Sequence, residues 1–195
     1  MTPKELIDIL GIAARLKTNT RHCWTDGDRK ESVADHSWRI ALMAMLLGQE
    51  EEFAGTDIAR VMKMCLIHDL GEAFTGDIPT FLKSSSDEEK EDEIFQRWVD
   101  TFPAAQRTEW KSLLEEMKEM RTTEAKLWKA LDKTEALISH NESDIGTWLP
   151  LEYDLQRTYG TEQVQFSSYM REFKKEIDLW TERKIEEEGN RTDSL

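Results

Sequence analysis

Apolar residues recur at every third or fourth position along most of the chain, which is the spacing of amphipathic helices. A serine or threonine with an acidic residue three positions later precedes several of these runs, as at Thr2, Ser32 and Ser86, and this pairing is typical of helix starts. The predicted helices cover residues 2–16, 32–47, 56–69, 86–102, 103–120, 122–138 and 162–187. No run alternates with the period of a strand over more than a few residues. The pattern therefore predicts an all-α protein.

Two segments interrupt the helical pattern. Residues 17–30 lack periodic apolar positions, and residues 71–84 contain two glycines and a proline, so we expect both to be loops. We expect one domain over residues 1–195, with a core at about 5–140, further helices at about 150–188 and a frayed tail at 189–195.

Composition narrows the range of partners and compartments. The 195 residues carry a formal net charge of −14, which argues against duplex nucleic acid and anionic membranes as partners. No apolar run approaches the ~18 residues of a membrane span, and the first residues lack the pattern of a signal peptide. Cys23 and Cys65 are too few for a disulfide framework, so we expect reduced thiols in a cytoplasmic protein. A small phosphate ester remains possible, because a bound cation and one arginine make a local positive site.

The stretch LIHDLGEAFTGDIPT, at residues 66–80, contains the densest group of chemically active side chains. Four of them occur within ten residues at the end of an apolar helical run: His68, Asp69, Glu72 and Asp77. Neighbouring residues in mid-helix point about 100° apart. Two adjacent ligands therefore converge on one ion only at a helix end or where several helices meet, and Gly71 makes a helix end plausible.

Two further candidates lie away from this stretch. His36 follows an aspartate near the start of the second predicted helix, and Asp132 lies in the apolar helical stretch KLWKALDKTEALI. A carboxylate on a core-facing stripe needs a partner, and a divalent metal is one of the few adequate ones. Each residue alone has a simpler interpretation, such as an ion pair for Asp132 or a hydrogen-bonded core position for a histidine. The combination favours a metal site, and these donors suit Mn²⁺, Co²⁺, Mg²⁺, Fe²⁺ or Zn²⁺.

The H…HD…D pattern of the HD-domain metal-dependent phosphohydrolases is matched by His36, His68, Asp69 and Asp132. The stretches ESVADHSWRIALMAMLL and LIHDLGEAFTGDIPT more closely resemble the HD-domain 5′-deoxynucleotidases and their HD-domain-containing relatives. The resemblance covers roughly residues 5–140. It implies a single-domain helical bundle, one divalent ion held at its centre by these four side chains, and a homodimer.

The resemblance and the residue types together suggest further roles. Four protein ligands on a six-coordinate ion leave room for a water and a phosphate oxygen, so the ion would polarise the phosphoryl group and acidify the water. Glu72, one turn past the HD pair, is the best candidate for proton transfer. Arg21 is expected to bind phosphate through paired hydrogen bonds, and Asp77 is expected to face the sugar hydroxyls.

Four more residues are candidates for contact with the substrate. In the best known bacterial 5′-deoxynucleotidases a tryptophan directly follows the arginine and helps to exclude ribose. Here Trp24 lies three residues after Arg21, and we expect it to fill the same role. Lys133 directly follows the last predicted metal ligand and is a second phosphate contact or a solvated lysine. His140 and Asp144 are one turn apart and reach the pocket mouth if the helix continues, with capping and surface hydrogen bonding as the alternative.

The sequence predicts a metal-dependent phosphomonoesterase that cleaves (deoxy)nucleoside 5′-monophosphates to nucleoside and phosphate. Two alternatives stay open: another phosphate ester or a nucleoside triphosphate at the same site, and a non-catalytic metal-binding regulatory module. The presence of Glu72, Arg21 and Asp77 weighs against the module, since a structural metal site needs none of them. We also expect a homodimer because several tryptophans lie on otherwise charged helices.

Overall fold

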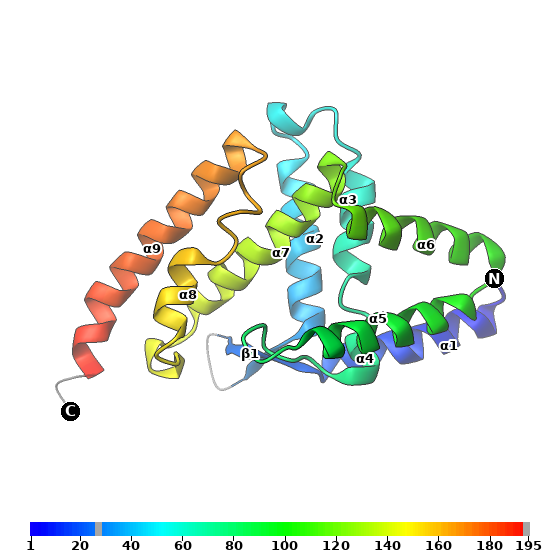
Figure 1. Cartoon of the computed structure of the whole chain (residues 1–195), viewed down its shortest axis with the longest axis horizontal. Coiled ribbons are helices and arrows are strands. Elements are labelled where there is room, and N and C mark those ends of the chain that lie inside the picture. Colours follow the sequence, from blue (N-terminus) through cyan, green and yellow to red (C-terminus); the bar gives the residue numbers. More distant parts are fainter. Residues whose placement is uncertain (26–28, 193–195) are drawn as a thin grey trace.

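A computed structural model describes residues 1–25 and 29–192 of the chain and shows a mostly helical protein (Figure 1). Its helices are α1 (Pro3–Ala13), α2 (Val33–Leu47), α3 (Ile58–Ile67), α4 (Glu72–Thr75), α5 (Ser85–Asp100), α6 (Ala104–Glu119), α7 (Thr123–Glu142), α8 (Glu152–Thr158) and α9 (Ser168–Thr192). Short 3-10 helices are η1 (Ala14–Lys17), η2 (Glu51–Phe53) and η3 (Ile145–Thr147). The all-α prediction is confirmed. In the two described ranges, none of the helices is long and apolar enough to cross a membrane.

Helices α2, α3 and α7 pack against one another at the centre of the molecule, with α6 and α9 on opposite sides of them (Figure 1). The buried apolar side chains of these three helices include Ile40, Val61, Met64, Leu127 and Leu131. Burying each such side chain contributes about 1.5–3 kcal/mol. The same helix α7 also buries the carboxylates Asp132 and Glu135. The packed core therefore fixes the positions of these charged groups.

An aromatic cluster joins α5 to α6. The Trp98 ring lies edge-on to Phe102, at 4.8 Å between centroids, and to Trp110, at 6.2 Å. Phe95 packs on the same two tryptophans. Edge-to-face pairs of this kind add about 0.5–1.5 kcal/mol each. Trp98 and Trp110 therefore stabilise the packing of α5 against α6 within one chain.

Capping boxes form where the sequence predicts the first two long helices to begin. Thr2 caps α1, and Ser32 caps α2 by accepting a hydrogen bond from the backbone N–H of Asp35, while the Asp35 carboxylate accepts one from the N–H of Ser32. Each box satisfies two N–H groups that the helix leaves unpaired. The prediction that Ser86 caps α5 is wrong, because Ser84 provides that box and the helix begins two residues earlier.

Both predicted loops contain regular structure. In residues 17–30, β1 (Thr20–Trp24) pairs with β2 (Lys30–Ser32) as an antiparallel hairpin, so this loop prediction is wrong. The register shifts within β1, and such an irregularity disturbs the alternation by which a strand is recognised in a sequence. In residues 71–84, the short helix α4 replaces part of the expected loop. Residues 26–28 of the first loop lie outside the described residues.

The C-terminal part differs from the prediction at both ends of its long helix. The separate helix α8 ends next to Gly160, whose φ of 73° favours glycine, and the chain then continues in turns to α9. An added Cβ at Gly160 would lie 3.0 Å from the Lys133 side chain, so this turn packs closely on α7. Helix α9 continues to Thr192, so the tail is helical to that point, and residues 193–195 lie outside the described residues.

Glu52, in η2, caps the first turn of α9. Its carboxylate accepts hydrogen bonds from the Ser168 hydroxyl at 2.6 Å and from the backbone N–H groups of Ser168 and Tyr169 at 2.8 and 2.9 Å. The Ser168 hydroxyl and these N–H groups lower the pKa of Glu52 to about 2. Because the folded pKa is below that of a free glutamate, the stabilisation is full above the unfolded pKa and is lost as pH falls toward 2.

Glu52→Ala is therefore expected to lower the free energy of unfolding by about 0.5–2 kcal/mol at neutral pH. Denaturant unfolding at neutral pH and at about pH 3 measures the effect, which should shrink at the lower pH. Glu51→Ala, at the preceding position of η2, is the matched control. The same loss of stability at both pH values would contradict the capping role.

Candidate active site

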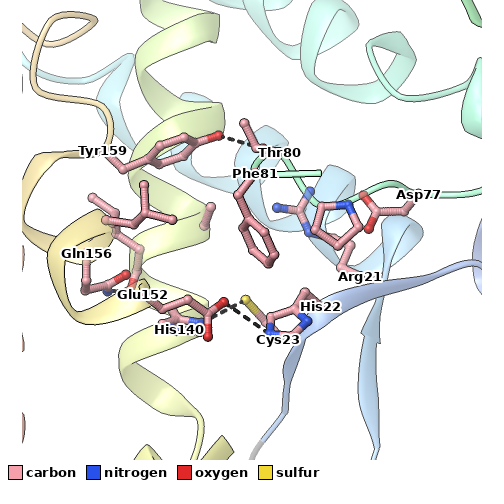
Figure 2. A pocket seen from close by; sticks show the side chains of 14 residues that line it. Arg21, His22, Cys23, Asp77, Thr80, Phe81, His140, Glu152, Gln156 and Tyr159 are labelled. Atoms are coloured by element: carbon pink, nitrogen blue, oxygen red, sulfur yellow. Dashed lines mark hydrogen bonds and ion pairs between the residues drawn. The ribbon is translucent and has the colours of Figure 1, made fainter. Parts of the chain in front are cut away.

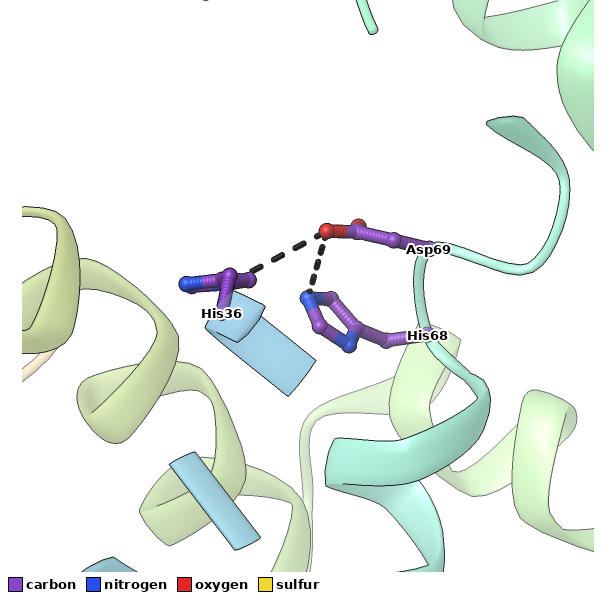
Figure 3. Close-up of side chains that lie close together, drawn as sticks. All are labelled: His36, His68 and Asp69. Carbon is purple, nitrogen blue, oxygen red and sulfur yellow. Dashed lines mark ion pairs between the residues drawn. The ribbon is translucent and has the colours of Figure 1, made fainter. Parts of the chain in front are cut away.

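The four predicted metal ligands meet where α2, α3 and α7 come together. His36 lies near the start of α2, and Asp132 lies in the middle of α7. Helix α3 ends at Ile67, so His68 is its C-terminal cap and Asp69 follows it. Because the backbone leaves the helix here, these two adjacent side chains turn toward the same point, as Figure 3 shows together with His36.

The donor atoms of these side chains lie close enough to share one ion. His68 Nε2 is 3.0 Å from Asp69 Oδ2 and 3.8 Å from Asp132 Oδ1. His36 Nε2 is 3.9 Å from Asp69 Oδ2 and 3.3 Å from Asp132 Oδ1. Bonds from a small divalent ion to nitrogen and oxygen are about 2.0–2.2 Å long. Four donors at this spacing fit around such an ion.

The hydrogen bonds of the two histidines also fit a metal. The Nδ1 atom of His36 contacts the Glu135 carboxylate, and Nδ1 of His68 lies 2.9 Å from the backbone carbonyl of Cys65. Both partners are acceptors, so Nδ1 donates a proton in each ring, and a bound metal would take the place of a proton on Nε2. Both Nε2 atoms are buried without a hydrogen-bond partner. Two lone pairs facing carboxylates are stabilised by a cation between them.

Glu135 is a functional residue that the sequence analysis missed. It lies one turn after Asp132 on α7, is completely buried, and holds the imidazole of His36. Burial opposes its ionisation, but the adjacent His36 lowers the pKa of Glu135 to about 2. A carboxylate behind a metal-binding histidine fixes the ring and raises its basicity. The signal in the sequence was a second acidic residue on the apolar stripe that carries Asp132.

Glu135→Gln is expected to lower the affinity for the divalent metal by about 10- to 100-fold, because the amide orients His36 less strongly. Titration of metal-depleted protein with Mn²⁺, followed by calorimetry, measures the change. Glu142→Gln serves as the matched control, since Glu142 is at the end of the same helix and contacts Arg39 at the surface. Equal metal affinity in wild type and Glu135→Gln would contradict this role.

Arg21 comes from β1 and lies between the metal ligands and a buried carboxylate. Its Nε atom is 3.1 Å from Glu31 Oε2, and its NH1 atom is 3.7 Å from Asp69 Oδ2. Although burial opposes the charge, Glu135, Glu31 and Asp69 raise the pKa of Arg21 above its usual range. The sequence analysis did not predict Glu31. This carboxylate holds one edge of the guanidinium and leaves the other toward the metal ligands.

Glu72 is the first residue of α4 and is buried beside the same ligands. Its Oε2 atom has no hydrogen-bond partner, and its backbone carbonyl accepts a hydrogen bond of 2.5 Å from the side-chain amide of Asn19. Burial, with repulsion from Asp69 and Asp77, raises the pKa of Glu72 to about 10. A carboxyl group in this environment holds a proton at neutral pH and can exchange it with a neighbour.

A cavity of about 360 Å³ opens beside the metal ligands (Figure 2). It is lined by Arg21, His22, Cys23, Asp77, Pro79, Thr80, Phe81, Ala136, Leu137, His140, Glu152, Leu155, Gln156 and Tyr159. Arg21 belongs both to this wall and to the neighbourhood of Asp69, so the cavity lies next to the metal cluster. Ligand pockets have volumes of about 300–1,000 Å³ and mostly apolar walls with a few polar groups.

Three other predicted residues lie at or near this cavity. Asp77 and His140 line it, and burial raises the pKa of Asp77. Lys133 Nζ lies 3.3 Å from the metal-ligand carboxylate of Asp132 and donates a hydrogen bond of 2.7 Å to the Tyr159 hydroxyl. Lys133 is therefore held beside the cluster and is not a solvated lysine.

Trp24 and Asp144 lie outside this cavity, in contrast to their predicted contacts with the substrate. Trp24 lines a second cavity together with Arg39, and Lys30 Nζ lies 5.5 Å from the centre of its ring. Arg21 and Trp24 are three residues apart on β1, and the alternation of side chains along a strand places such residues on opposite faces. Asp144 caps η3 by accepting a hydrogen bond of 2.7 Å from the N–H of Gly146. Asp144 is therefore a helix cap, which was the alternative to a contact with the substrate.

Comparison with known proteins defines the class of this site. The model of the HD domain family matches residues 13–174. Human 5′-deoxynucleotidase HDDC2 is 30% identical over 143 residues, which are 71% of this chain and 68% of the human protein. A dATP triphosphohydrolase of Salmonella phage PMBT28 is 39% identical over 98 residues, 44% of this chain and 46% of that protein.

A solved structure points to the same class of protein. The crystal structure of a protein described as a predicted metal-dependent phosphohydrolase, from Magnetospirillum magnetotacticum MS-1, has a TM-score of 0.78 and 28% identity, with 93% of both chains covered. The fold and the metal cluster define an enzyme of the HD phosphohydrolase class that binds a divalent metal. The chain belongs to the HD domain family.

Proposed function

We propose that the protein hydrolyses nucleoside 5′-monophosphates, with deoxynucleotides as preferred substrates, to nucleoside and inorganic phosphate. The observation that carries this proposal is the position of Arg21, which lies 3.7 Å from the metal-ligand carboxylate of Asp69 and also lines the cavity of about 360 Å³. A phosphate at the metal cluster can thus extend its nucleoside into the cavity. The name of the human relative, a 5′-deoxynucleotidase, supports the same substrate class.

Arg21 binds the phosphate. Its Nε lies 3.1 Å from Glu31 Oε2 in an ion pair and its NH1 faces Asp69, so the guanidinium can donate hydrogen bonds to a phosphate bound at the cluster. Lys133 adds a second positive charge beside Asp132. His36, His68, Asp69 and Asp132 would hold a divalent ion, which would supply the Lewis acidity to polarise a phosphoryl oxygen and favour ionisation of a water.

Glu72 transfers the proton. Its unpartnered Oε2 is buried near Asp69, and its raised pKa keeps a proton on the carboxyl group, which can donate it to the leaving 5′ oxygen. Asp77 lies on the cavity wall and accepts hydrogen bonds from the sugar hydroxyls. These roles divide the work among phosphate binding, proton transfer and sugar positioning.

A nucleoside triphosphate is the second candidate substrate. The similarity to a phage dATP triphosphohydrolase supports it, and so does the pair of lysines beside Asp132, with Lys129 Nζ at 3.0 Å and Lys133 Nζ at 3.3 Å from Oδ2. Additional positive charge at the cluster would suit a longer phosphate chain.

Product analysis separates the two candidates. Metal-depleted protein is supplemented in turn with Mn²⁺, Co²⁺, Mg²⁺ and Zn²⁺ and given deoxy and ribo 5′-monophosphates and the matching triphosphates. The proposal predicts inorganic phosphate and nucleoside from the monophosphates, with faster release from the deoxy series. Release of intact triphosphate from dATP, with the monophosphates untouched, would replace it by the second candidate.

We further propose that the protein is a homodimer. Helix α2 exposes three large apolar side chains, Trp38, Met45 and Leu46, which are 63%, 49% and 61% exposed. Packing this face of α2 against a second copy of the chain removes the apolar surface from water. Light scattering is expected to give twice the mass of the chain, and a monomer at micromolar concentration would contradict the proposal.

A further inference from the structure

The cavity has a second polar end, away from the metal ligands. In Figure 2, Arg21 and Asp77 lie on one side of Phe81, and Glu152, Gln156 and His140 lie on the other. These polar residues come from α7 and α8. None of them has a role in the phosphate chemistry described above. Polar groups buried at the end of a pocket usually fix the orientation and identity of a ligand.

Glu152 provides a fixed hydrogen-bond acceptor at this end. The residue is 5% exposed, and its carboxylate accepts the backbone N–H of Leu149 at 2.6 Å and lies 3.1 Å from His22 Nε2. Burial opposes ionisation, but nearby His140 and the Leu149 N–H lower the pKa of Glu152 below its usual range. An ionised carboxylate only accepts hydrogen bonds and has about four lone-pair positions. It therefore has capacity for a donor on a ligand.

His140 provides a buried donor next to this acceptor. The residue is 6% exposed, and its Nε2 atom has no hydrogen-bond partner although Glu152 Oε2 is 3.5 Å away. Its Nδ1 atom lies 3.4 Å from Cys23 Sγ. Burial raises the pKa of Cys23 to about 12, so the thiol keeps its proton and can donate it to Nδ1. The ring proton then lies on Nε2.

Packing holds this donor and acceptor in place. The His140 ring stacks on Trp148, with 4.5 Å between centroids and 30° between planes. The Trp148 Nε1–H donates to the His140 carbonyl at 3.1 Å. Phe81 and Leu155 add aromatic and apolar wall at this end, which suits the flat face of a heterocycle.

We propose that Glu152 and His140 read the hydrogen-bonding edge of the nucleobase and favour bases with an exocyclic amino group. Glu152 accepts the amino N–H, and His140 Nε2–H donates to the adjacent ring nitrogen. Adenine and cytosine offer this pair of groups. In hypoxanthine and uracil, a carbonyl oxygen replaces the amino group and places two acceptors against each other, which is unfavourable in a buried site. This inference rests on the proposed nucleotidase function.

Matched substrates test the inference on the wild-type enzyme. dCMP is compared with dUMP, dAMP with dIMP, and all four with deoxyribose 5-phosphate, which has no base. The expected result is a kcat/KM about 10- to 100-fold higher for each amino base than for its keto partner, since an unpaired buried polar group is costly. Equal kcat/KM within both pairs would overturn the base assignment while leaving the nucleotidase proposal standing. No hydrolysis of any of the five would overturn both.

Glu152→Gln tests the residue itself. The carboxamide can donate as well as accept, so the preference for dCMP over dUMP is expected to fall by about 10-fold or more. The ratio of kcat/KM for dCMP to that for deoxyribose 5-phosphate should fall with it. Glu182→Gln is the matched control, because Glu182 contacts α8 through Arg157 from outside the cavity. An equal loss on dCMP, dUMP and deoxyribose 5-phosphate in Glu152→Gln would show a structural role and overturn the proposal.

Discussion

Replacing Asp69 with asparagine is expected to abolish metal-dependent turnover, with kcat/KM lowered by about 10³-fold or more. The Asp69 carboxylate faces the Nε2 atoms of both His68 and His36, at 3.0 and 3.9 Å. Its loss removes a charge and a ligand from the cluster and leaves the two imidazoles without their shared anion. Phosphate release and metal content per chain measure the effect.

Asp57→Asn is the control for this substitution. Asp57 caps the other end of α3 by accepting the N–H of Arg60 at 3.0 Å, and asparagine is an equally good cap. The control is expected to keep both metal and activity. Retention of both in Asp69→Asn would show that this residue is not a ligand.

Replacing Glu72 with glutamine is expected to lower kcat by about 10²- to 10⁴-fold while metal and nucleotide still bind. The amide has nearly the same shape as the buried carboxyl but cannot exchange a proton with the water or with the leaving oxygen. Single-turnover hydrolysis of dCMP and metal titration separate the chemical step from binding.

The control for Glu72 is Glu88→Gln, in the exposed first turn of α5. Its kcat should equal that of the wild type. If Glu72→Gln binds metal and nucleotide normally and hydrolyses dCMP at the rate of the wild type, proton transfer belongs to another group.

The helical framework could be predicted from the sequence because it depends on local information, and the four residues of the central cluster were identified by their match to the H…HD…D pattern. The capping boxes at Thr2 and Ser32 are set by residues three positions apart. The apolar run predicts that His68 and Asp69 lie at the end of a helix, and the structure ends α3 at Ile67, directly before them. Asp132 was recognisable because a carboxylate on an apolar stripe is costly without a partner.

The rest of the site depends on contacts between distant segments. Glu135 holds His36 across 99 positions of sequence, and Glu31 pairs with Arg21 through the fold of a hairpin whose irregular register has no clear period. The direction of Trp24 was likewise decided by that hairpin. The cavity wall combines β1, the segment after α4, α7 and α8. Periodicity within one helix carries no information about such a wall.

The most direct test of the account is a titration of metal-depleted protein with Mn²⁺ while phosphate release from dCMP is followed. The account predicts no release before the metal is added, and a rate that saturates near about one ion per chain. In Asp69→Asn neither binding nor release should appear. Undiminished release in the presence of a chelator, with no metal bound, would contradict the assignment of the cluster as the catalytic centre.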